Sequence, residues 1–582
     1  MKKFFRITGV VVAIAMIAGV LYGCGAKGPA ATQPPATQAP ATEAPATEAP
    51  KTEAPVQTET PTEAPTEAPA PAAPIVISFF NVGGVIDGFD QSDPVWTNNP
   101  VAQKILADTN IQVKWDFPTG DGNDKLSLLL ASGDYPEVVL GPNDVNLNTM
   151  ISEGIAIPLD DLINQYGADY LKSMGSILDM TRSSDGHIYS LARGYGDIPA
   201  GSTPPGFGSG FIVREDAYEG IGSPPIKTLD DIYNILVQFS QKYPTNYKGD
   251  SVWPLGGYVQ TWQNGIQTLL EAAGMENDIW YVNNGQIQYW VRSPQALDVI
   301  KFYNKCYREG LLDPEAFTSD RATWTTNKVA TARTLSYFGG WWMTWTTQND
   351  YVAAGIPDGD KMTFVPYAFA ATASQQQKPK LVPINRRGNA SVVVTTACKN
   401  PEAVMQLCNY LATPEGNFMV QNGVEGIMWD MVNNKPVMKQ AFIDRWLAGE
   451  SDEKFAAETG LRMYNYIVST DIGRSPWGTY WILKDDPVVM GDAKAAIRDA
   501  NLGPYWYDAY PTGGLFAGAP EDIGMLVTKM DEMFNNQLYV SVMADSEAAC
   551  EADFQQYVSD LETAGLAAYE NYANTVYQSR IK

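Results

Sequence analysis

Histidine is almost absent from this chain of 582 residues, because His187 is the only one. A Ser-His-Asp or Cys-His mechanism would have to use His187, and a zinc site built from several histidines is excluded. His187 lies in the stretch Asp185–Tyr189, which is typical of a turn that enters a strand, so we interpret it as an exposed turn residue. Paired carboxylates stay open as catalytic groups, because the chain has 66 acidic residues.

Cysteine is also scarce. The chain has five cysteines and no Cys-x-x-Cys pair, and after Cys24 there remain Cys306, Cys398, Cys408 and Cys550. Disulfides are compatible with a location outside the cytoplasm, but their pairing cannot be predicted from these spacings. We expect buried free thiols instead, since unpaired cysteine behaves as a small apolar residue.

Basic residues are outnumbered, and the formal net charge is −26. A phosphate backbone requires a basic face, so we predict no nucleic-acid partner. No P-loop occurs, no Gly-x-Gly-x-x-Gly follows a strand, and no Asp-x-Asp-x-Asp-Gly calcium loop is present. We therefore expect no cofactor and no metal site.

The first 24 residues have a basic head, an apolar run from about Ile7 to Val20, and the sequence Leu21-Tyr-Gly-Cys24. The apolar run is shorter than the roughly 20 residues that span a bilayer, and this order is typical of an export signal. The ending resembles the lipobox of bacterial lipoproteins, which implies that residues 1–23 are removed and that Cys24 carries lipid. An ordinary export signal with an incidental cysteine, or an uncleaved anchor, is the alternative. We predict a lipid-anchored chain on the extracellular face of the cell membrane.

Residues 24–74 follow as a tether. After Cys24 they consist almost entirely of Ala, Pro, Thr, Glu and Gln, and they contain no Leu, Ile, Phe, Tyr or Trp. Such a segment buries too little apolar surface to offset its ordering entropy, so we predict a disordered linker. As a flexible coil it would span about 40 Å, and proline would lengthen it. An O-glycosylated stalk is an alternative form of the same linker.

Residues 75–582 form the folded part, and they contain no second apolar run of membrane length. A short apolar strand is expected at Ile75–Phe80, a helix at about 100–109, a strand at 111–117, a helix at 125–131 and a buried strand at 137–140. This alternation predicts an α/β fold with parallel strands and crossover helices. Thr228-Leu-Asp-Asp231 predicts a capped helix that ends near Tyr243, and residues 519–578 read as long amphipathic helices.

Six motifs occur in an order that resembles the extracellular solute-binding proteins of carbohydrate-uptake ABC transporters, including maltose-binding-like proteins. They are Leu130–Val139, Ile151–Asp161, Asp185–Leu191, Phe211–Asp216, Pro225–Ile232 and Asn400–Gly426. One departure is Ala192, which stands where proline is usual in that family. Each motif alone is weak, since Gly-Asp-x-Pro is a common helix-to-strand turn, but six in order behind a lipobox support one another.

The resemblance implies a two-lobed periplasmic-binding-protein-like fold in which crossover strands act as hinges. The first crossover is expected near Leu191–Asp197 and the second near Val365–Asn385. The first lobe would then comprise about 75–190 and 366–425, and the second about 197–365 with much of 426–582 as C-terminal helices. The chain would function as a monomer.

Aromatic residues indicate where the ligand binds. The densest group is Phe338–Trp345, and a sugar ring binds well against a flat aromatic side chain with polar groups beside it. Trp341 or Trp342 would supply this platform, and core packing of either residue is the alternative.

Four further candidates come from position in the chain. Asn143 and Asp144 follow a buried parallel strand, where open α/β sheets bind ligands, although a plain Asx turn fits them equally well. Arg193 and Tyr195 lie at the expected first crossover. Arg193 is suited to a hydroxyl pair, a uronate or a phosphate, and an ion pair between the lobes is its alternative.

The leading hypothesis is a non-enzymatic binding protein that captures a carbohydrate, in particular an oligosaccharide, and delivers it to an ABC transporter permease by hinge closure. A surface glycan hydrolase with two carboxylates is one alternative, but no pair stands out in the sequence. The same fold with a non-sugar solute such as a peptide is the other.

Overall fold

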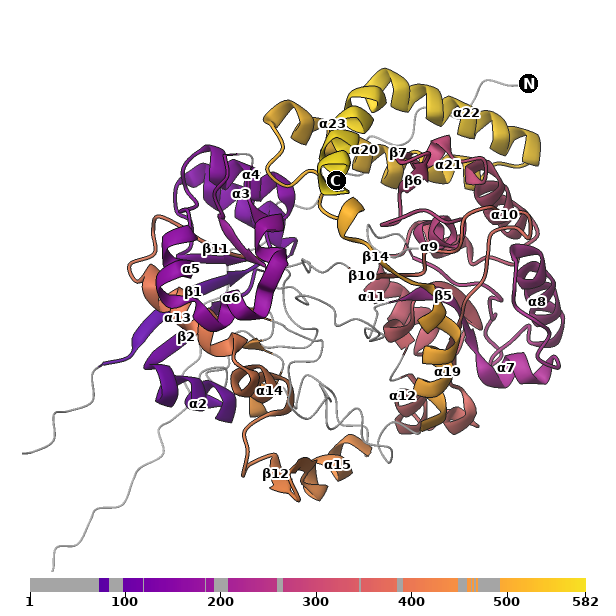
Figure 1. Cartoon of the computed structure of the whole chain (residues 1–582). Coiled ribbons are helices and arrows are strands. Elements are labelled where there is room, and N and C mark those ends of the chain that lie inside the picture. The colour runs from indigo at the N-terminus through magenta and orange to yellow at the C-terminus, as the bar shows by residue number, and fades with distance from the viewer. Residues whose placement is uncertain are drawn as a thin grey trace, which may run out of the picture. The chain divides into compact units, whose positions relative to one another are not determined.

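The computed structural model describes residues 73–82, 98–118, 120–183, 185–192, 208–258, 265–344, 347–384, 391–447, 458–461, 463–464, 467–468 and 492–581. The expected signal peptide, Cys24 and nearly all of the tether lie outside this range. Figure 1 shows the described elements, which build two lobes of mixed helix and sheet, as expected from the sequence.

The first lobe is built on a five-stranded sheet with the order β2-β1-β3-β11-β4. Its strands are β1 (Ile75–Asn81), β2 (Ile111–Asp116), β3 (Val138–Leu140), β4 (Ser190–Ala192) and β11 (Ser391–Val394). β1 runs parallel to β2 and β3, with Ile75 opposite Ile111 and Phe79 opposite Val138. β11 is antiparallel to both β3 and β4. The return of the chain at β11 therefore completes a sheet that began about 300 residues earlier.

Successive apolar residues of these strands enter two different cores. Phe79 packs into one apolar cluster and Phe80 into another on the opposite face of the sheet. Side chains alternate across a strand, so a sheet covered on both faces requires a continuous apolar run. This explains why the run at 75–80 shows no polar alternation.

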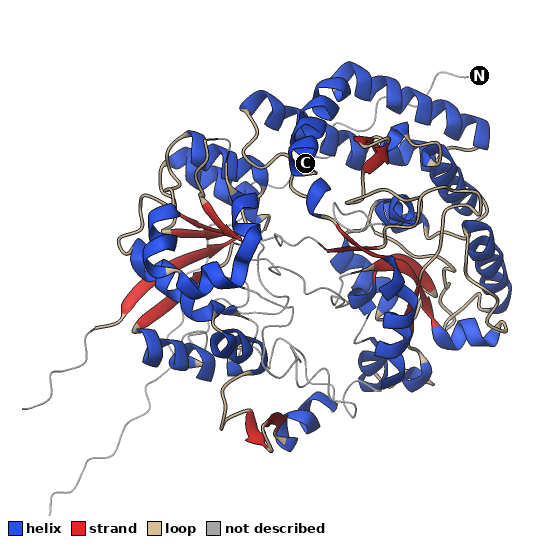
Figure 2. Cartoon of the chain, in the orientation of Figure 1, coloured by secondary structure: helices blue, strands red, loops and turns tan. Residues whose placement is uncertain are grey.

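Helices cover both faces of this sheet (Figure 2). They are α2 (Pro100–Thr109), α3 (Gly122–Ser132), α4 (Asp144–Ser152), α5 (Asp160–Tyr166), α6 (Ala168–Met174), η1 (Gly175–Thr181), α13 (Pro401–Ala412) and α14 (Pro414–Asn422). A hairpin of β12 (Trp429–Val432) and β13 (Lys435–Met438), together with α15 (Gln440–Leu447), packs against α14 through Phe418.

The second lobe contains a three-stranded antiparallel sheet with the order β8-β5-β9. Its strands are β5 (Ser209–Arg214), β8 (Ser336–Gly340) and β9 (Phe364–Tyr367). Two smaller pairs accompany it: β6 (Trp280–Asn283) with β7 (Gln286–Tyr289), and β10 (Val382–Ile384) with β14 (Trp506–Asp508).

The helices of the second lobe surround a large apolar core. They are α7 (Glu215–Gly220), α8 (Leu229–Lys242), α9 (Gly265–Ala272), η2 (Trp290–Arg292), α10 (Ala296–Arg308), η3 (Pro314–Phe317), α11 (Arg321–Trp324), η4 (Thr325–Val329), η5 (Trp341–Thr344), α12 (Thr347–Ala353), η6 (Gly359–Lys361), α19 (Asp492–Leu502), η8 (Gly503–Tyr505), η9 (Tyr510–Thr512), α20 (Glu521–Asn536), α21 (Leu538–Val542), α22 (Glu547–Ala564) and α23 (Leu566–Arg580).

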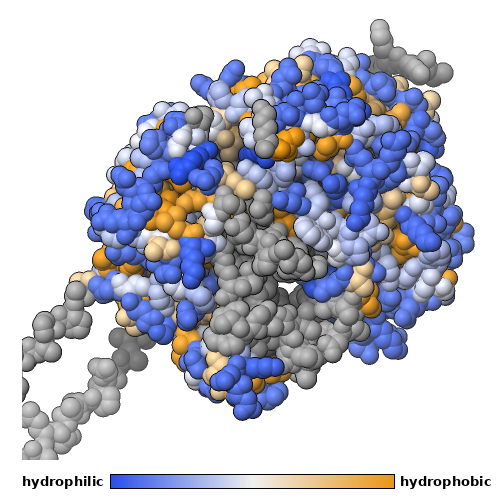
Figure 3. All heavy atoms as spheres, in the orientation of Figure 1, coloured by the Kyte–Doolittle hydropathy of each residue, from blue (hydrophilic) through white to orange (hydrophobic). Residues whose placement is uncertain are grey.

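The C-terminal helices α20 to α23 pack onto this lobe around Trp290. The ring of Trp290 is fully buried and lies 6.0 Å from the ring of Phe534 and 5.8 Å from that of Phe554. Aromatic contacts of this kind bury large apolar area, so these helices form part of the lobe's core. Hydrophilic side chains cover most of the face shown in Figure 3.

Several local predictions match the structure. Thr228 caps α8 by accepting from the Asp231 N–H, and the Asp231 side chain accepts from the Thr228 N–H, which is the expected capping box. Cys306, Cys408 and Cys550 are buried free thiols, and Cys398 is a half-buried one.

The boundary that we expected at about residue 366 differs from the observed pairing. β9 pairs with β5, and β10 pairs with β14, so the chain stays with the second lobe through Ile384. It rejoins the first sheet only at β11. The early boundary failed because the partner of β10 lies more than 100 residues later in the sequence.

Candidate ligand-binding site

The carboxyl edge of the first sheet carries a group of asparagines. β1 ends at the buried Asn81, and β3 leads through a short turn to Asn143 at the start of α4. Since β1 and β3 are parallel, both ends lie at the same edge. This edge is the one at which open α/β sheets bind ligands.

Hydrogen bonds fix this edge. The Asn143 backbone N–H donates to Asn123 Oδ1 at 2.9 Å, and Asn146 Nδ2 donates to the Asn123 carbonyl at 3.1 Å. Asn146 Oδ1 accepts from Ser127 Oγ at 2.9 Å. These bonds tie the first turns of α3 and α4 together, so the edge is a preorganised polar surface.

The structure gives Asn143 and Asp144 specific local roles. Asn143 Oδ1 accepts from the Asn146 N–H at 2.8 Å and thereby caps α4. This bond from an asparagine side chain to a nearby backbone N–H is of the Asx type that the sequence offered as an alternative to ligand binding. Asp144 is half-buried in the first turn of α4. Burial, with the Asp144 charge as a second cause, raises the pKa of Asp531 in α20 to about 6.

The second sheet presents its own edge where the first crossover enters it. Ser209, at the start of β5, is opposite Gly340 at the end of β8. The Trp341 N–H donates to the Gly208 carbonyl at 3.4 Å. Trp341 and Trp342 therefore leave the sheet at the edge where β5 begins.

The Trp341 side chain is half-buried and packs against the second lobe. Its ring contacts apolar clusters of the second lobe, and the Arg498 guanidinium lies 4.5 Å from its ring centroid. Arg498 belongs to α19, which packs against β9. One face of the Trp341 ring is thus engaged by a cation, an arrangement that stabilises by roughly 0.5–2 kcal/mol.

Trp342 is half-buried and lies over the backbone of Gly340. A Cβ added to Gly340 would overlap the Trp342 indole, so glycine is required there for this placement. The two tryptophan rings meet edge to face at 5.8 Å and 84°. Of the two, Trp342 fits the role of an aromatic platform better, with Trp341 and Arg498 supporting it.

A buried carboxyl pair lies directly behind this edge. Glu271 of α9 accepts a hydrogen bond from Ser209 Oγ through Oε2, and its Oε1 is buried without a hydrogen-bond partner in the described part of the chain. Burial, and next the charge of Asp278, raises the pKa of Glu271 well above its ordinary value. Burial therefore favours the protonated form of Glu271, and the bond from Ser209 ties α9 to β5 at this edge.

The chain limits how far the two edges can separate. Only residues 385–390 connect Ile384 of β10 with Ser391 of β11. A fully extended connection of that length reaches at most about 25 Å.

Three predicted residues lie outside the described ranges: Arg193, Tyr195 and the lipidation residue Cys24. Sequence reasoning missed Asn81, Asn123, Asn146 and Arg498. Asn81 had a readable signal, because it is the first polar residue after an apolar strand, as Asn143 is. Arg498 had none, since it reaches Trp341 through packing of a helix more than 150 residues away.

The described part of the chain holds no cluster of three or more metal-ligating side chains. Within the same ranges, no helix combines the length and apolarity that crossing a bilayer requires. His187 is exposed in its turn and lies 3.2 Å from Asp160 through Nδ1.

Two curated relatives match part of the chain. FusA of Streptococcus pneumoniae serotype 4, a fructooligosaccharide ABC transporter substrate-binding protein, is 26% identical over 252 residues, which is 39% of this chain and 45% of FusA. Lipoprotein LipO of Bacillus subtilis is 25% identical over 37% of this chain and 41% of LipO. The chain thus spans less than half the length of these relatives.

A solved structure of FusA, an EF-hand mutant bound to fructo-nystose, superimposes with a TM-score of 0.63 at 18% identity. That match covers 87% of this chain and 99% of the FusA chain, and it shows a shared fold. The family model for bacterial extracellular solute-binding proteins matches residues 94–418, more than half of the chain. This protein therefore belongs to the bacterial extracellular solute-binding protein family.

Proposed function

We propose that this chain is a lipid-anchored, extracellular binding protein that captures an oligosaccharide and delivers it to an ABC transporter permease. The observation that carries the proposal is that the edges of the two sheets carry different kinds of side chain. One carries the asparagine group around Asn143, and the other carries Trp342 beside Trp341 and Arg498. A sugar chain presents apolar C–H faces and hydroxyl groups, and these edges supply an aromatic ring and amide groups.

The proposed mechanism is hinge closure. Ligand contacts from both edges exist together only when the lobes close, so the ligand favours the closed form. Residues 193–207 and 385–390 are the connections about which closure would occur. The permease would recognise the closed form of this monomer.

Binding without catalysis is part of the proposal. Family membership supports it, and the carboxyl pair Glu271 and Asp278 lies beneath β5, where Glu271 is engaged by Ser209. A hydrolase would need two carboxyl groups on either side of a glycosidic bond. We therefore propose that bound oligosaccharide is released intact.

Titration calorimetry of the full chain against fructooligosaccharides and pectic, alginate and human-milk oligosaccharides tests capture. We expect a dissociation constant in the micromolar range, which is about −8 kcal/mol, for at least one class. Trp342→Ala should weaken binding at least tenfold. Tyr247→Ala, which removes an exposed aromatic ring at the opposite end of the second sheet, is the matched control and should bind normally. No binding to any class, or cleavage of the bound sugar, would overturn the proposal.

Anchoring is tested separately with Cys24→Ser. We propose that Cys24 carries lipid, so this variant should appear in the culture medium while the parent chain stays with the membrane fraction. Metabolic labelling with an alkyne fatty acid should mark the parent chain and leave Cys24→Ser unlabelled. Equal membrane retention of both chains would contradict a lipid anchor at Cys24.

A further inference from the structure

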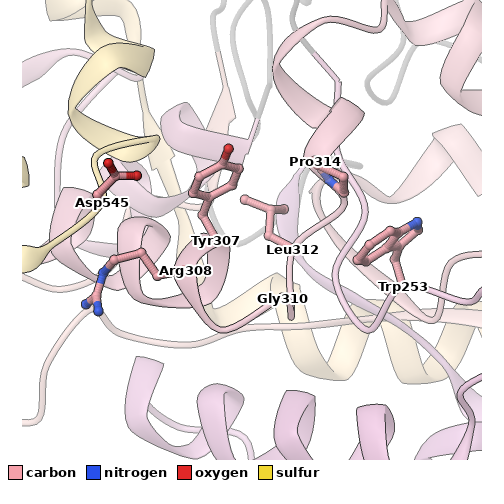
Figure 4. A pocket seen from close by; sticks show the side chains of 7 residues that line it. All are labelled: Trp253, Tyr307, Arg308, Gly310, Leu312, Pro314 and Asp545. Atoms are coloured by element: carbon pink, nitrogen blue, oxygen red, sulfur yellow. The ribbon is translucent and has the colours of Figure 1, made fainter. Parts of the chain in front are cut away.

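A recess of about 400 Å³ lies in the second lobe beside the end of α10 (Figure 4). It is lined by Trp253, Tyr307, Arg308, Gly310, Leu312, Pro314 and Asp545. The rings of Trp253 and Tyr307 stand on either side of Leu312. Its volume falls within the range of about 300–1,000 Å³ that small-molecule sites occupy.

This recess is separate from the proposed oligosaccharide site. Trp253 pairs with Thr334, which precedes β8, whereas Trp341 follows the other end of that strand. From Thr334 to Gly340 a strand extends about 20 Å. The two places therefore lie at opposite ends of β8, and a ligand at one edge does not fill the other.

The walls of the recess are largely aromatic and apolar. Leu312 is buried, and the rings of Trp253 and Tyr307 are half-buried. Trp253 Nε1 is buried and has no acceptor in the described part of the chain. This N–H has no exposed surface and points away from the other lining residues, so the Trp253 side chain contributes its ring, and not a donor, to the recess.

The charged end of the recess is held in place by a buried amide. Asn304 is fully buried and donates from Nδ2 to the carbonyls of Val542 and Ala544, at 3.0 and 2.7 Å. Its Oδ1 accepts from Arg308 Nε at 2.7 Å. One asparagine thus fixes both the Arg308 side chain and the turn that carries Asp545, and this is a preorganised donor and acceptor pair.

We propose that this recess is a second saccharide site, which takes one or two sugar units of a polysaccharide outside the cell. Two aromatic rings around an apolar floor suit the C–H faces of a sugar, and the guanidinium of Arg308 and the carboxylate of Asp545 suit its hydroxyl groups. One charge of each sign favours a neutral sugar over a polyanion. On the tethered chain, such a site holds the protein at the polymer from which its oligosaccharides are released.

Polysaccharide binding at the second site follows from the recess itself. Only the advantage of this binding for oligosaccharide uptake rests on the proposed function. The test is therefore made with two readouts. Affinity gel electrophoresis and pull-down measure retention of the full chain by insoluble or embedded neutral polysaccharides, including inulin, xylan, galactan and mannan. Calorimetry with short oligosaccharides measures the edge site.

Trp253→Ala removes one ring of the recess, and Tyr307→Ala removes the opposite ring. We expect each variant to weaken retention at least fivefold while oligosaccharide affinity changes less than twofold. Trp342→Ala should show the reverse pattern. Tyr247→Ala, an exposed aromatic near the same end of the sheet but outside the recess, is the control and should be retained like the parent chain.

Two results would overturn the second site: no retention by any neutral polysaccharide, or retention that Trp253→Ala and Tyr307→Ala leave unchanged while both remain folded by circular dichroism. Failure of oligosaccharide binding with retention intact would instead overturn the proposed function alone. Loss of both readouts in Trp342→Ala, with normal behaviour of the recess variants, would assign all binding to the edge site.

Discussion

Glu271 is a buried carboxyl group whose protonation should be visible in the stability of the protein. Burial and Asp278 raise its pKa well above 4.5, so the folded chain holds a proton that the unfolded chain releases. The stability that this group contributes is therefore fully present below about pH 4.5 and is lost as pH rises through the raised value.

Glu271→Gln should remove this dependence, because the amide keeps the shape and stays neutral. We expect the melting temperature of the parent chain to fall more steeply than that of the variant between about pH 5 and pH 9. Differential scanning fluorimetry over that range measures it. Glu425→Gln, at an exposed position, should keep the parent profile, and parallel curves for Glu271→Gln and the parent would disprove a proton held by Glu271.

Gly340 sets the position of Trp342. Gly340→Ala places a methyl group against the indole, so Trp342 must move while β8 keeps its hydrogen bonds to β5. We expect about a tenfold loss of oligosaccharide affinity, or about 1.4 kcal/mol, with an unchanged circular dichroism spectrum. Gly524→Ala in α20, where a Cβ has open space, is the control. Normal affinity in Gly340→Ala would show that the Trp342 ring does not contact the ligand.

At the scale of elements, α4 links the first sheet to its candidate site, and Asn143 begins that helix. Asn143→Ala removes the acceptor for the Asn146 N–H and should lower the free energy of unfolding by about 1 kcal/mol. Asn143→Asp keeps the cap and should be close to the parent in stability. Chemical denaturation measures both.

The same pair separates capping from ligand contact. If Asn143 only caps α4, Asn143→Asp binds oligosaccharide like the parent. If its amide nitrogen also donates to the sugar, Asn143→Asp loses affinity without losing stability. We expect the second outcome, because Asn143 is exposed at the edge where ligand would sit.

At the scale of the whole molecule, one side chain joins elements of both lobes. Asn148 of α4 donates to the Phe516 carbonyl at 3.3 Å and accepts from the Gly518 N–H at 2.6 Å. Phe516 belongs to the apolar core of the second lobe, whereas α4 packs on the first sheet. The lobes are therefore coupled through Asn148 as well as through the connecting segments.

Asn148→Ala should lower the free energy of unfolding by about 1–2 kcal/mol, because two hydrogen bonds are lost. We also expect a broader thermal transition, since two cores with fewer shared contacts unfold less cooperatively. Asn148→Asp keeps the acceptor for Gly518 and should fall between the two. Calorimetry of the three chains measures this, and a transition as sharp in Asn148→Ala as in the parent would rule out the coupling.

Much of the local structure was readable from residue patterns. The run at 75–80 predicted β1, and the Thr228 capping box predicted the start of α8. Trp341 and Trp342 stand out in the sequence because they belong to its densest aromatic group, Phe338–Trp345. Such signals are local, and the structure retains them.

What the sequence could not supply depends on contacts between distant segments. Arg498 covers Trp341 only because α19 packs on β9, and the boundary near residue 366 moved because β10 pairs with β14. The recess at Trp253 likewise combines three separate parts of the chain. No local sequence pattern predicts these contacts between distant segments.

The sequence by itself determined the fold class, the family resemblance, and the expectation of an exported carbohydrate-binding chain. Periodicity and capping predict the alternating α/β elements, the first 24 residues predict export, and carbohydrate binding is what the resemblance carried by the six motifs implies. The tertiary structure decided that Trp341 is packed against a cation while Trp342 covers Gly340, and that Asn143 caps a helix. Those roles depend on which surfaces meet after the chain has folded, because packing and hydrogen-bond geometry arise between segments that lie far apart in the sequence.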